Sequence, residues 1–542
     1  MNNFKKFVTY FWLVIISVGV LLGIGLVQNN LDDSIEKNHL RFTGQIKNAP
    51  PVVAFTTVAM GSFRGILADL LWLRAHRLQD KGNYFEMVQL ASWITKLQPR
   101  FSGATAYLAW NMAYNISVTC SSFADRWRWV NEGIKLIRDE ALLYNPEDAS
   151  LYKELGWIFQ HKLGNILDDG NLYYKNMLAI EMSKVIGAKP DWKALAAAPA
   201  DYAAFLKKYP RNEKDPFWKA LKKAGFEDYD SFFRKFKEAA GKLPVKFVEA
   251  LNNPEMVKSL QTYFTGQWLR DKYKLDPKIV LEINNRYGKL DWRLPEAQAI
   301  YWATMGLKKT PSHRDLSCER MITQALFNAF KAGKLLALDA KKLESVVCIP
   351  NLNVVDSVLK AYEDAYIENN KQSSFRSAKI NFMKDAIVIL YNYGSFTKAR
   401  EYYKMLQKEE PGKYRAQMES FVMKQWAEDV RDASSKKATD VISGLIYRSI
   451  NFMVLGEEDA ALANENIARY IYSNYQRFNA DIKDRVGLAP FNKIKAGVID
   501  ACMTSFPPLM KEILKQKIAE QKQGKKKSVE NASGDGKSKS EN

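Results

Sequence analysis

The strongest constraint on the fold is an apolar run near the amino terminus, from Phe7 to Val27, that contains no charged residue. As an α-helix rising about 1.5 Å per residue, this run reaches roughly 30 Å, the thickness of the hydrocarbon core of a bilayer. The rest of the chain is polar enough to be water-soluble. We therefore expect one N-terminal transmembrane helix that ties a soluble body to a membrane.

The charges that flank this run predict its orientation. Lys5 and Lys6 precede it, and acidic residues follow it between positions 32 and 36. Because positive charge stays on the cytoplasmic side, the amino terminus is expected in the cytoplasm and the body outside it. A cleaved signal peptide is the alternative, although the run is longer than the roughly 7–15 apolar residues typical of such a signal. A lipoprotein is excluded, because the first cysteine is Cys120.

A second apolar stretch, from Pro51 to Phe63, is too short to cross a bilayer. It is interpreted as a buried connector or as a segment that rests on the membrane surface.

The composition predicts a large core without a metal or disulfide framework. Hydrophobic residues make up 47% of the chain, and its 4 cysteines and 4 histidines are widely separated. Neither CxxC nor HExxH spacing occurs. Cys318 and Cys348 could pair in an oxidising compartment, but the sequence does not place them within reach of one another. We expect no metal and no cofactor.

The formal net charge of +20 first suggests a nucleic-acid partner. The predicted location outside the cytoplasm argues against this, and the charge is diffuse, without a nucleic-acid-binding motif. Anionic lipid headgroups or an acidic wall polymer are the more natural partners. A solvated basic surface without a specific partner is the other interpretation.

Two segments share a spacing typical of paired helices. In "GNYFEMVQLASWITKLQP" (82–99) and "GSFTKAREYYKMLQKEEP" (394–411), a glycine opens the segment, an aromatic residue follows two positions later, and a proline closes it. "NPEDASLYKELGWIF", from Asn145, begins a third such unit, and a weaker one follows Leu455.

These segments resemble the tetratricopeptide repeat, a helix-turn-helix unit that stacks into a solenoid. The 82–99 unit departs from the pattern at Met87, where a small residue is usual, and the third unit has Gly164 one position late. The resemblance covers about a third of the chain. It implies an all-α fold: an α-solenoid of divergent hairpins behind a transmembrane helix.

A proline-rich, Lys- and Phe-rich segment interrupts these repeats, and the end of the chain lacks large apolar residues, which predicts disorder. The sequence therefore divides into a cytoplasmic tip with the transmembrane helix (1–30), a connector (31–63), N-terminal repeats (64–189), a basic helical insertion (190–285), C-terminal repeats (286–515) and a disordered basic tail (516–542).

The densest cluster of polar and aromatic residues lies between positions 107 and 161. In tetratricopeptide proteins, inner-helix Asn and Arg side chains hold extended peptides, so the resemblance implies a partner-binding groove here. Burial of both asparagines and of the tryptophans in the core is the other interpretation. The candidate residues are Trp110, Asn111, Asn115, Arg126, Arg128 and Arg138.

A second charged group, Asp291, Arg293 and Glu296, is either a recognition site or the polar start of a helix. No GxSxG or SxxK motif stands in a strand-turn-helix context, and no P-loop or GxGxxG occurs. A wall-cleaving enzyme with a lysozyme-like domain would need one catalytic glutamate, and Glu154 is a candidate by position alone, without such a domain after it. We therefore expect no enzymatic activity.

By resemblance to bacterial envelope proteins with an anchor and such repeats, the chain is expected to scaffold protein or peptide partners in the periplasm, from the inner membrane. The alternative is a binder of anionic lipid or wall polymer. That function would use the basic residues of the insertion, Lys207, Lys208, Lys222, Lys223, Arg234, Lys235 and Lys237.

Overall fold

The computed structural model describes residues 63–98, 101–165, 168–212, 214–309, 316–337, 346–430, 435–480 and 487–520, together with residues 12, 15–20, 23, 27, 34 and 37. The chain divides into two compact units. The first comprises Met1–Thr105 and Asp139–Pro146, and the second comprises Ala106–Arg138 and Glu147–Asn542. The boundaries expected at residues 190 and 285 lie inside the second unit, and they stay predictions.

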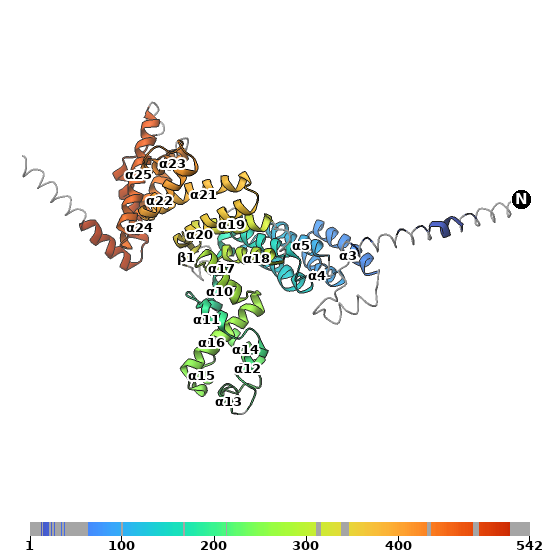
Figure 1. Ribbon diagram of the computed structural model, residues 1–542. Helices are drawn as coiled ribbons and strands as arrows, with labels where there is room; N and C mark the ends of the chain where they lie inside the picture. Colours follow the sequence, from blue (N-terminus) through green and yellow to red (C-terminus); the bar gives the residue numbers. More distant parts are fainter. Residues whose placement is uncertain are drawn as a thin grey trace, which may run out of the picture. The chain divides into compact units, whose positions relative to one another are not determined.

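Helices account for nearly all of the regular structure in the described residues, which confirms the all-α class (Figure 1). The solenoid stays a prediction. The strands in this part of the chain form one antiparallel pair, β1 (Lys334–Ala337) and β2 (Val347–Ile349), which the sequence did not predict. Leu335 lies opposite Cys348, and the register is irregular between Leu335 and Ala337.

Most of the predicted transmembrane run and most of the 31–63 connector lie outside the described residues. Within that run, residues 15–20 are helical. None of the helices in the described ranges is long and apolar enough to cross a membrane. The membrane anchor and its orientation therefore stay predictions, and the predicted tail from residue 521 onward also lies outside the described part.

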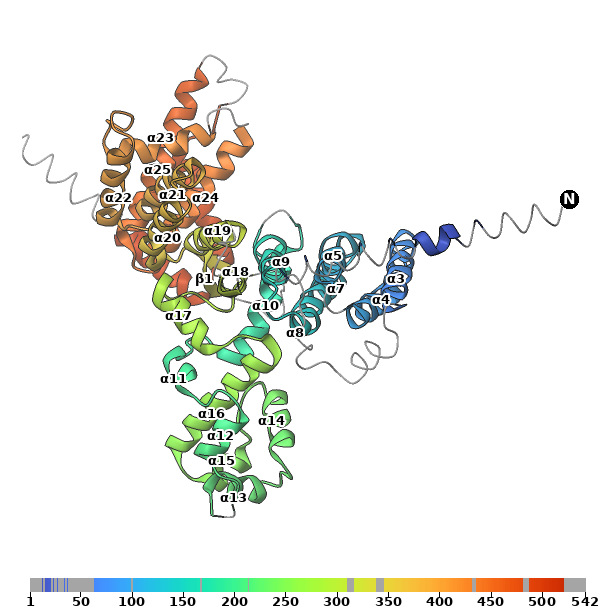
Figure 2. The same cartoon turned by 45° about the vertical axis from the view of Figure 1, so that its right-hand side comes forward.

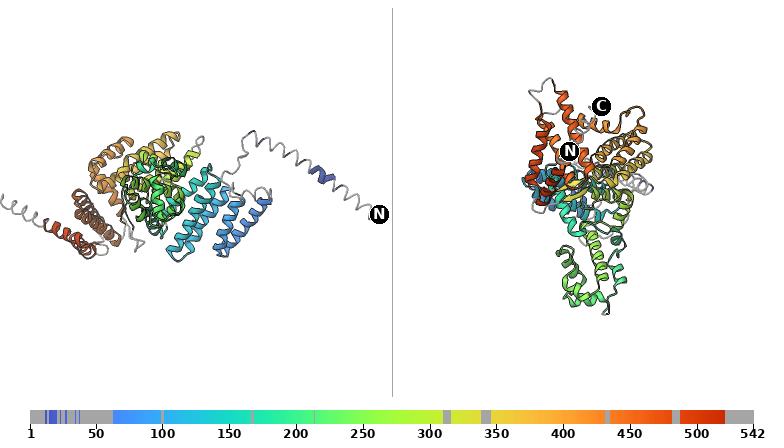
Figure 3. Two further views of the ribbon diagram at one scale, coloured as in Figure 1. Left: turned by 90° about the horizontal axis from the view of Figure 1, so that it is seen from below. Right: turned by 90° about the vertical axis from the view of Figure 1, so that its left-hand side faces the viewer.

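In the first unit, α3 (Phe63–Asp80) and α4 (Tyr84–Leu97) pack together as a helical hairpin (Figure 3). Their contact surface consists of small and aliphatic side chains. Met87, where the tetratricopeptide pattern has a small residue, is fully buried together with Ala91. The flexible thioether of methionine fills an irregular space that a small residue would leave open.

One turn geometry recurs in three hairpins, at Gly82, Gly394 and Gly456. Each glycine has a positive φ, between 71° and 80°. In each turn the glycine N–H donates to the carbonyl three residues earlier, and the next N–H donates to the carbonyl five residues before it. This is a Schellman turn, which uses glycine because residues with a Cβ are strained at positive φ.

The elements that follow the first hairpin include several π-helical segments, labelled η1 to η4. They are, in order, α5 (Ser102–Trp110), η1 (Asn111–Ile116), α6 (Ser117–Thr119), α7 (Phe123–Lys135), η2 (Leu136–Ala141), α8 (Leu142–Tyr144), α9 (Ala149–Trp157), η3 (Ile158–Leu163) and α10 (Asn171–Ile186). Next come α11 (Trp192–Ala197), α12 (Tyr202–Lys208), α13 (Pro216–Lys223), α14 (Tyr229–Glu238), α15 (Val245–Leu251), α16 (Pro254–Trp268), η4 (Leu269–Tyr273) and α17 (Pro277–Tyr287).

The remaining elements are α18 (Pro295–Lys309), α19 (Leu316–Ala332), the strands, the 3-10 turn η5 (Leu352–Val354), α20 (Val355–Glu368), α21 (Ser373–Asn392), α22 (Phe396–Glu409), α23 (Met418–Val430), α24 (Ser435–Val454), α25 (Glu458–Phe478) and α27 (Phe491–Ser505). Neighbours in this order pack on one another from α18 to α22, and α24 packs on α25 (Figures 1 and 2).

Helix α18 packs closely on α9 and on α19, although α9 lies far earlier in the sequence. Two glycines permit this approach. A Cβ at Gly156 would lie 2.7 Å from the Met321 sulfur, and one at Gly306 would lie 3.0 Å from the Cys318 sulfur. These glycines therefore set the separation between the helices around the candidate sites described below.

The helices α12 to α16 lie together (Figure 2). Phenylalanine rings from these helices contact one another and form a core. The fully buried members are Phe205, Phe217, Phe232, Phe236, Phe247 and Phe264. Pro216, Pro254 and Pro277 each stand in the first turn of a helix, where proline lacks an N–H that the helix does not need. These three prolines therefore mark the starts of α13, α16 and α17.

The hairpin α21/α22 contacts the hairpin α24/α25 through the turn at Gly394. A Cβ at Gly394 would lie 3.1 Å from the backbone nitrogen of Ala460. Beside it, the buried Asn464 amide donates to the carbonyl of Asn392 at 2.7 Å. The glycine thus serves both its own turn and the contact between the hairpins.

Candidate functional site

The six predicted binding residues differ in their burial and in their contacts. Trp110 is exposed and stacks on Tyr114 at a centroid distance of 5.3 Å. Asn111 is fully buried. Asn115 is exposed and donates to the Asn111 side chain at 2.5 Å, so the two amides share a face of η1, as their spacing predicted. The predicted burial holds for Asn111 and not for Asn115.

The three predicted arginines are in different environments. Arg126 donates to the Cys120 carbonyl at 2.9 Å and pairs with Asp169 at 2.5 Å, so its guanidinium holds two loop segments. Arg128 is exposed on α7. Arg138, in η2, lines a cavity that is described below.

Trp110 and Tyr114 belong to an aromatic cluster with Trp157 of α9 and His161 of η3. The His161 ring lies 5.7 Å from Tyr114 and stacks on Trp157 at 4.8 Å, with an interplanar angle of 12°. The Tyr114 hydroxyl and the His161 Nδ1 are buried without a hydrogen-bond partner among the described residues. Both atoms could bond to a group that enters this cluster.

Burial dominates the acid–base properties of the cluster. It raises the pKa of Tyr114, with Glu154 and Asp168 adding to the rise, so the phenol stays protonated. Burial and the neighbouring Lys162 lower the pKa of His161, so its imidazole is neutral near pH 7. The cluster therefore offers a neutral imidazole and a neutral phenol.

A buried ion pair between Lys162 and Asp168 lies beneath this cluster. The Lys162 ammonium also faces the rings of Tyr114 and Tyr174, at 5.4 Å and 5.8 Å from their centroids. Burial by itself raises the pKa of Asp168, but the Lys162 bond and the N–H of Gly170 outweigh burial and lower it. Removing either charge would leave the other buried and unpaired, so the pair fixes η3 against the following loop.

A groove of about 420 Å³ opens beside the aromatic cluster, between α9 with η3 and α19. Trp157 belongs both to the groove and to the aromatic cluster, and its side chain is 37% exposed. Gln160 donates to Gln324 at 3.2 Å, while its own carbonyl oxygen is buried without a donor in the described part of the chain. The groove is lined by Lys153, Glu154, Trp157, Gln160, Ser317, Arg320, Met321 and Gln324.

A cavity of about 140 Å³, the Arg138 cavity, lies among α7, α10, α18 and the π-helical segments η2, η3 and η4. π-Helical segments are rare and often mark functional sites. Its wall contains aromatic rings and three cationic side chains. Its lining residues are Trp127, Asn131, Ile134, Lys135, Arg138, Phe159, Leu178, Glu181, Lys272, Tyr273, Gln298 and Trp302.

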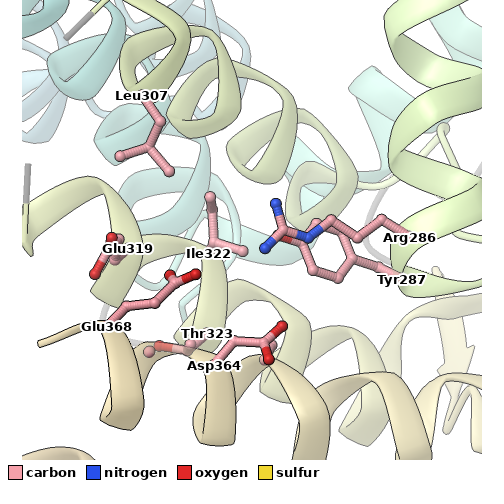
Figure 4. Close-up of a pocket in the computed structure, with 10 residues that line it drawn as sticks. Arg286, Tyr287, Leu307, Glu319, Ile322, Thr323, Asp364 and Glu368 are labelled. Carbon is pink, nitrogen blue, oxygen red and sulfur yellow. The ribbon is translucent and has the colours of Figure 1, made fainter. Parts of the chain in front are cut away.

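An acidic pocket of about 270 Å³ lies among α17, α19 and α20 (Figure 4). Arg286 and Tyr287 extend from α17 on one side, and the carboxylates of Glu319, Asp364 and Glu368 extend from α19 and α20. Glu319 accepts a hydrogen bond from the side chain of Asn369. Three carboxylates against one arginine favour a cationic group.

The predicted charged group at the start of α18 is a structural junction. Arg293 and Asp291 pair at 2.7 Å, and Asp291 also accepts from the backbone N–H of Leu335 in β1. Glu296 is buried in the first turn of α18 and lies 3.5 Å from Lys175. The helix-start interpretation is thus correct for Glu296, while Asp291 joins α18 to the strand pair.

No disulfide joins Cys318 to Cys348, and both residues lie in the described part of the chain. Cys318 is buried against α18, and Cys348 belongs to β2. Burial, followed by the nearby Glu296, raises the pKa of Cys348 to about 11, so it is an unreactive thiol at neutral pH.

The basic insertion carries a hollow of about 880 Å³, the basic hollow. Arg211, Lys219, Lys222 and Lys223 line it, against the single carboxylate of Glu227. The guanidinium of Arg211 lies 5.5 Å from the Trp218 ring centroid. Lys222 and Lys223 are thus the two predicted basic residues that contribute to a concave surface.

Sequence reasoning missed the groove and most of the aromatic cluster. Trp157 and His161 are four positions apart, which places them on one helix face and could have predicted their stacking. The pairing of Gln160 with Gln324 could not be predicted, because the two residues are 164 positions apart and no local pattern connects them.

No group of His, Cys, Asp and Glu side chains in the described ranges could hold a metal ion. In the comparisons with known proteins, no family model matches the sequence. No curated protein matches it at a significant level.

Proposed function

We propose that this chain is a membrane-anchored adaptor that binds a peptide segment of a partner protein in the groove between α9 with η3 and α19. The observation that carries the proposal is that both walls of this groove present side chains able to contact a peptide. Lys153, Trp157 and Gln160 from one side face Arg320 and Gln324 from the other. An extended peptide needs such a combination of aromatic surface and amide groups that bond to its backbone.

The unsatisfied carbonyl oxygen of Gln160 supports a peptide as the occupant. A buried acceptor without a donor costs free energy, on the order of 1–3 kcal/mol, and a backbone N–H of a bound peptide would remove that cost. The exposed face of Trp157 supplies apolar contact area at the same place. The proposed role is binding without catalysis, and no cofactor belongs to it.

The setting of this adaptor follows from the sequence. We propose that Phe7–Val27 anchors it in a bacterial inner membrane, with the body in the periplasm, and that its hairpins are divergent tetratricopeptide-like units of a solenoid. The common turn at Gly82, Gly394 and Gly456 supports the second part. An anchor raises the effective concentration of the groove for partners at the same membrane.

A photo-crosslinking amino acid at Gln324 of the full-length protein, in its native membrane, tests the proposal. Gln324 is exposed in the groove, and Gln516 is an exposed glutamine outside it. We expect discrete protein adducts from position 324 and none of the same adducts from position 516. Identical adducts from both positions, or lipid adducts alone, would reject the groove as the binding site.

A pair of charge reversals controls for nonspecific effects. Arg320→Glu changes the groove, whereas Arg400→Glu changes an exposed arginine on α22. The adducts at position 324 should weaken with Arg320→Glu and persist with Arg400→Glu. Equal loss in both variants would indicate a general electrostatic association in place of a peptide site.

The basic hollow favours a second function, binding of an anionic polymer or lipid headgroup. Its test is the binding of poly(glycerol phosphate) to the full-length protein in neutral nanodiscs at low and high salt. Steep loss with salt, and loss in Lys222→Glu/Lys223→Glu, would support it, because salt screens exposed charges within about 10 Å at 0.1 M. The control, Lys404→Glu/Lys408→Glu, reverses two exposed lysines on α22; equal loss there would exclude the hollow.

A further inference from the structure

The Arg138 cavity brings together residues from three π-helical segments. Arg138 comes from η2, Phe159 from η3, and Lys272 and Tyr273 from η4. A π-helical segment widens the helix by one residue and shifts the side chains that follow it. All three π-helical segments contribute a side chain to this one cavity. The departures from α-helical geometry therefore lie around the same space.

The cavity wall has an excess of positive charge. Arg138, Lys135 and Lys272 are cationic, and Glu181 is the carboxylate among the lining residues. Lys135 also pairs with Glu132, which does not line the cavity, at 2.7 Å. Glu181 already lies 3.6 Å from the Lys272 ammonium and accepts from the Tyr273 hydroxyl at 3.4 Å. The wall therefore favours an anionic group over a neutral or cationic one.

The remaining wall combines apolar side chains with the amides of Asn131 and Gln298, and it carries one indole N–H without an acceptor in the described part of the chain. Trp127, Phe159 and Leu178 are buried around the cavity. Trp302 is only 2% exposed, and its indole N–H has no acceptor among the described residues. A buried N–H normally bonds to an oxygen, so this donor points to an acceptor that the chain itself does not supply.

We propose that the Arg138 cavity binds the carboxylate of a small acid with a branched aliphatic or phenyl group. Arg138 and the neighbouring ammonium groups attract the carboxylate, the Trp302 indole donates to an oxygen, and the aromatic wall holds the apolar part. The volume fits this class, since a cavity of about 150 Å³ lined by apolar residues holds a molecule the size of benzene.

A free organic acid and the C-terminal residue of a peptide share this chemistry. The cavity has no lining residue in common with the groove. The inference therefore stands separately from the proposed peptide groove, and either can fail without the other.

Isothermal titration of the full-length protein in neutral nanodiscs tests the inference with three probes. Isocaproate represents a free acid, N-acetyl-leucine represents a peptide terminus, and N-acetyl-leucinamide lacks the carboxylate. We expect binding of at least one acid and none of the amide. Binding of isocaproate alone identifies a free acid as the ligand, and binding of N-acetyl-leucine alone identifies a chain terminus. Equal binding of acid and amide, or no binding of either acid, overturns the inference.

Two substitutions locate the binding. Arg138→Gln should weaken the acid roughly tenfold or more, because a hydrogen bond to a charged group contributes at least that factor. Arg128→Gln changes the exposed arginine of α7 and should leave the affinity unchanged. Trp302→Phe keeps a ring and removes the indole N–H, and it should also weaken the acid. If Arg138→Gln and Arg128→Gln have equal effects on the acid, the cavity is not its site.

Discussion

The helices of the insertion and the hairpins near the carboxyl terminus differ in how they begin. The side chain at the start of α11, α12, α13, α14 and α16 accepts a hydrogen bond from a backbone N–H of the first turn. In contrast, α22 and α25 have no such side-chain bond at the residues that directly precede them, Ser395 and Glu457. Their starts follow directly from the glycine turns at Gly394 and Gly456.

The two regions also differ in their cores. The short insertion helices surround large buried phenylalanines, whereas α25 buries mainly Ala460, Ala461, Ala463 and Ala468 with Ile467 and Ile471. Short helices are marginal by themselves, so they need side-chain caps and large packing partners. The longer hairpin helices depend on close approach, which small residues and a tight turn permit. Stability is therefore expected to reside in different residue types in the two regions.

Loss of a core phenylalanine should have the largest effect. Phe232→Ala is expected to destabilise the insertion by about 3–5 kcal/mol, because it removes a fully buried ring from a packed aromatic core. Phe478 in α25 is 62% exposed, and Phe478→Ala should change stability by no more than about 0.5 kcal/mol. Hydrogen exchange resolved by segment measures both. Faster exchange across α12–α16 in both variants would contradict the difference between the regions.

Alanine substitution of the turn glycines Gly394 and Gly456 should cause the next largest loss of stability. The loss should differ between the two positions. Gly456→Ala is expected to cost about 1–2 kcal/mol, the penalty for a Cβ at positive φ. Gly394→Ala should cost more, because its Cβ would also lie 3.1 Å from the Ala460 backbone. Urea midpoints of the two variants measure the difference. Equal midpoints would show that the contact between the hairpins contributes nothing.

Removal of a helix cap should have a moderate effect in the insertion and little effect in the hairpins. Asn253 accepts from the N–H of Met256 at 3.0 Å, so Asn253→Ala should cost about 1 kcal/mol. Ser395 makes no such bond, so Ser395→Ala should cost much less. Asn253→Asp, which restores an acceptor, serves as the control. The comparison fails if the serine variant loses as much stability as Asn253→Ala.

The sequence predicted the hairpins because their turns are local. The intervals from Gly82 and Gly394 to the closing prolines are short, and the glycines occupy the turns that the pattern requires. It also predicted that the 190–285 segment is helical. The aromatic core of that segment was not predicted, because it depends on pairings such as Phe205 with Tyr263, whose positions no period connects.

The candidate sites were less accessible to sequence reasoning than the hairpins. Arg138 was selected from its position in a polar, aromatic stretch, and it does line a cavity. Asn111 was selected from the same stretch, yet it is buried and bonded to its helical neighbour. Periodicity places residues on a face, but the neighbours that cover that face come from distant segments. The π-helical segments add to this limit, because they shift the face without an evident sequence signal.

The smallest expected effect arises outside both regions, at His161 in the aromatic cluster. Burial lowers the pKa of its imidazole below that of the unfolded chain, so the unfolded chain binds the proton more readily. The resulting loss of stability begins as the pH falls through about 6.5 and levels off below the folded pKa. The carboxylates titrate near pH 4, well below this window, so the two contributions are separable.

Melting temperatures measured from about pH 8 to pH 5 on the full-length protein test this expectation. His161→Gln should lower the melting temperature at pH 8, because the stacking on Trp157 is lost, and should flatten the decline below about pH 6.5. His76→Gln alters an exposed histidine on α3 and should preserve the decline. A decline unchanged in His161→Gln would assign the titration to another group. A flattened decline would show that the cluster contains a neutral imidazole, whose Nδ1 donates or accepts a hydrogen bond according to the tautomer that a ligand selects.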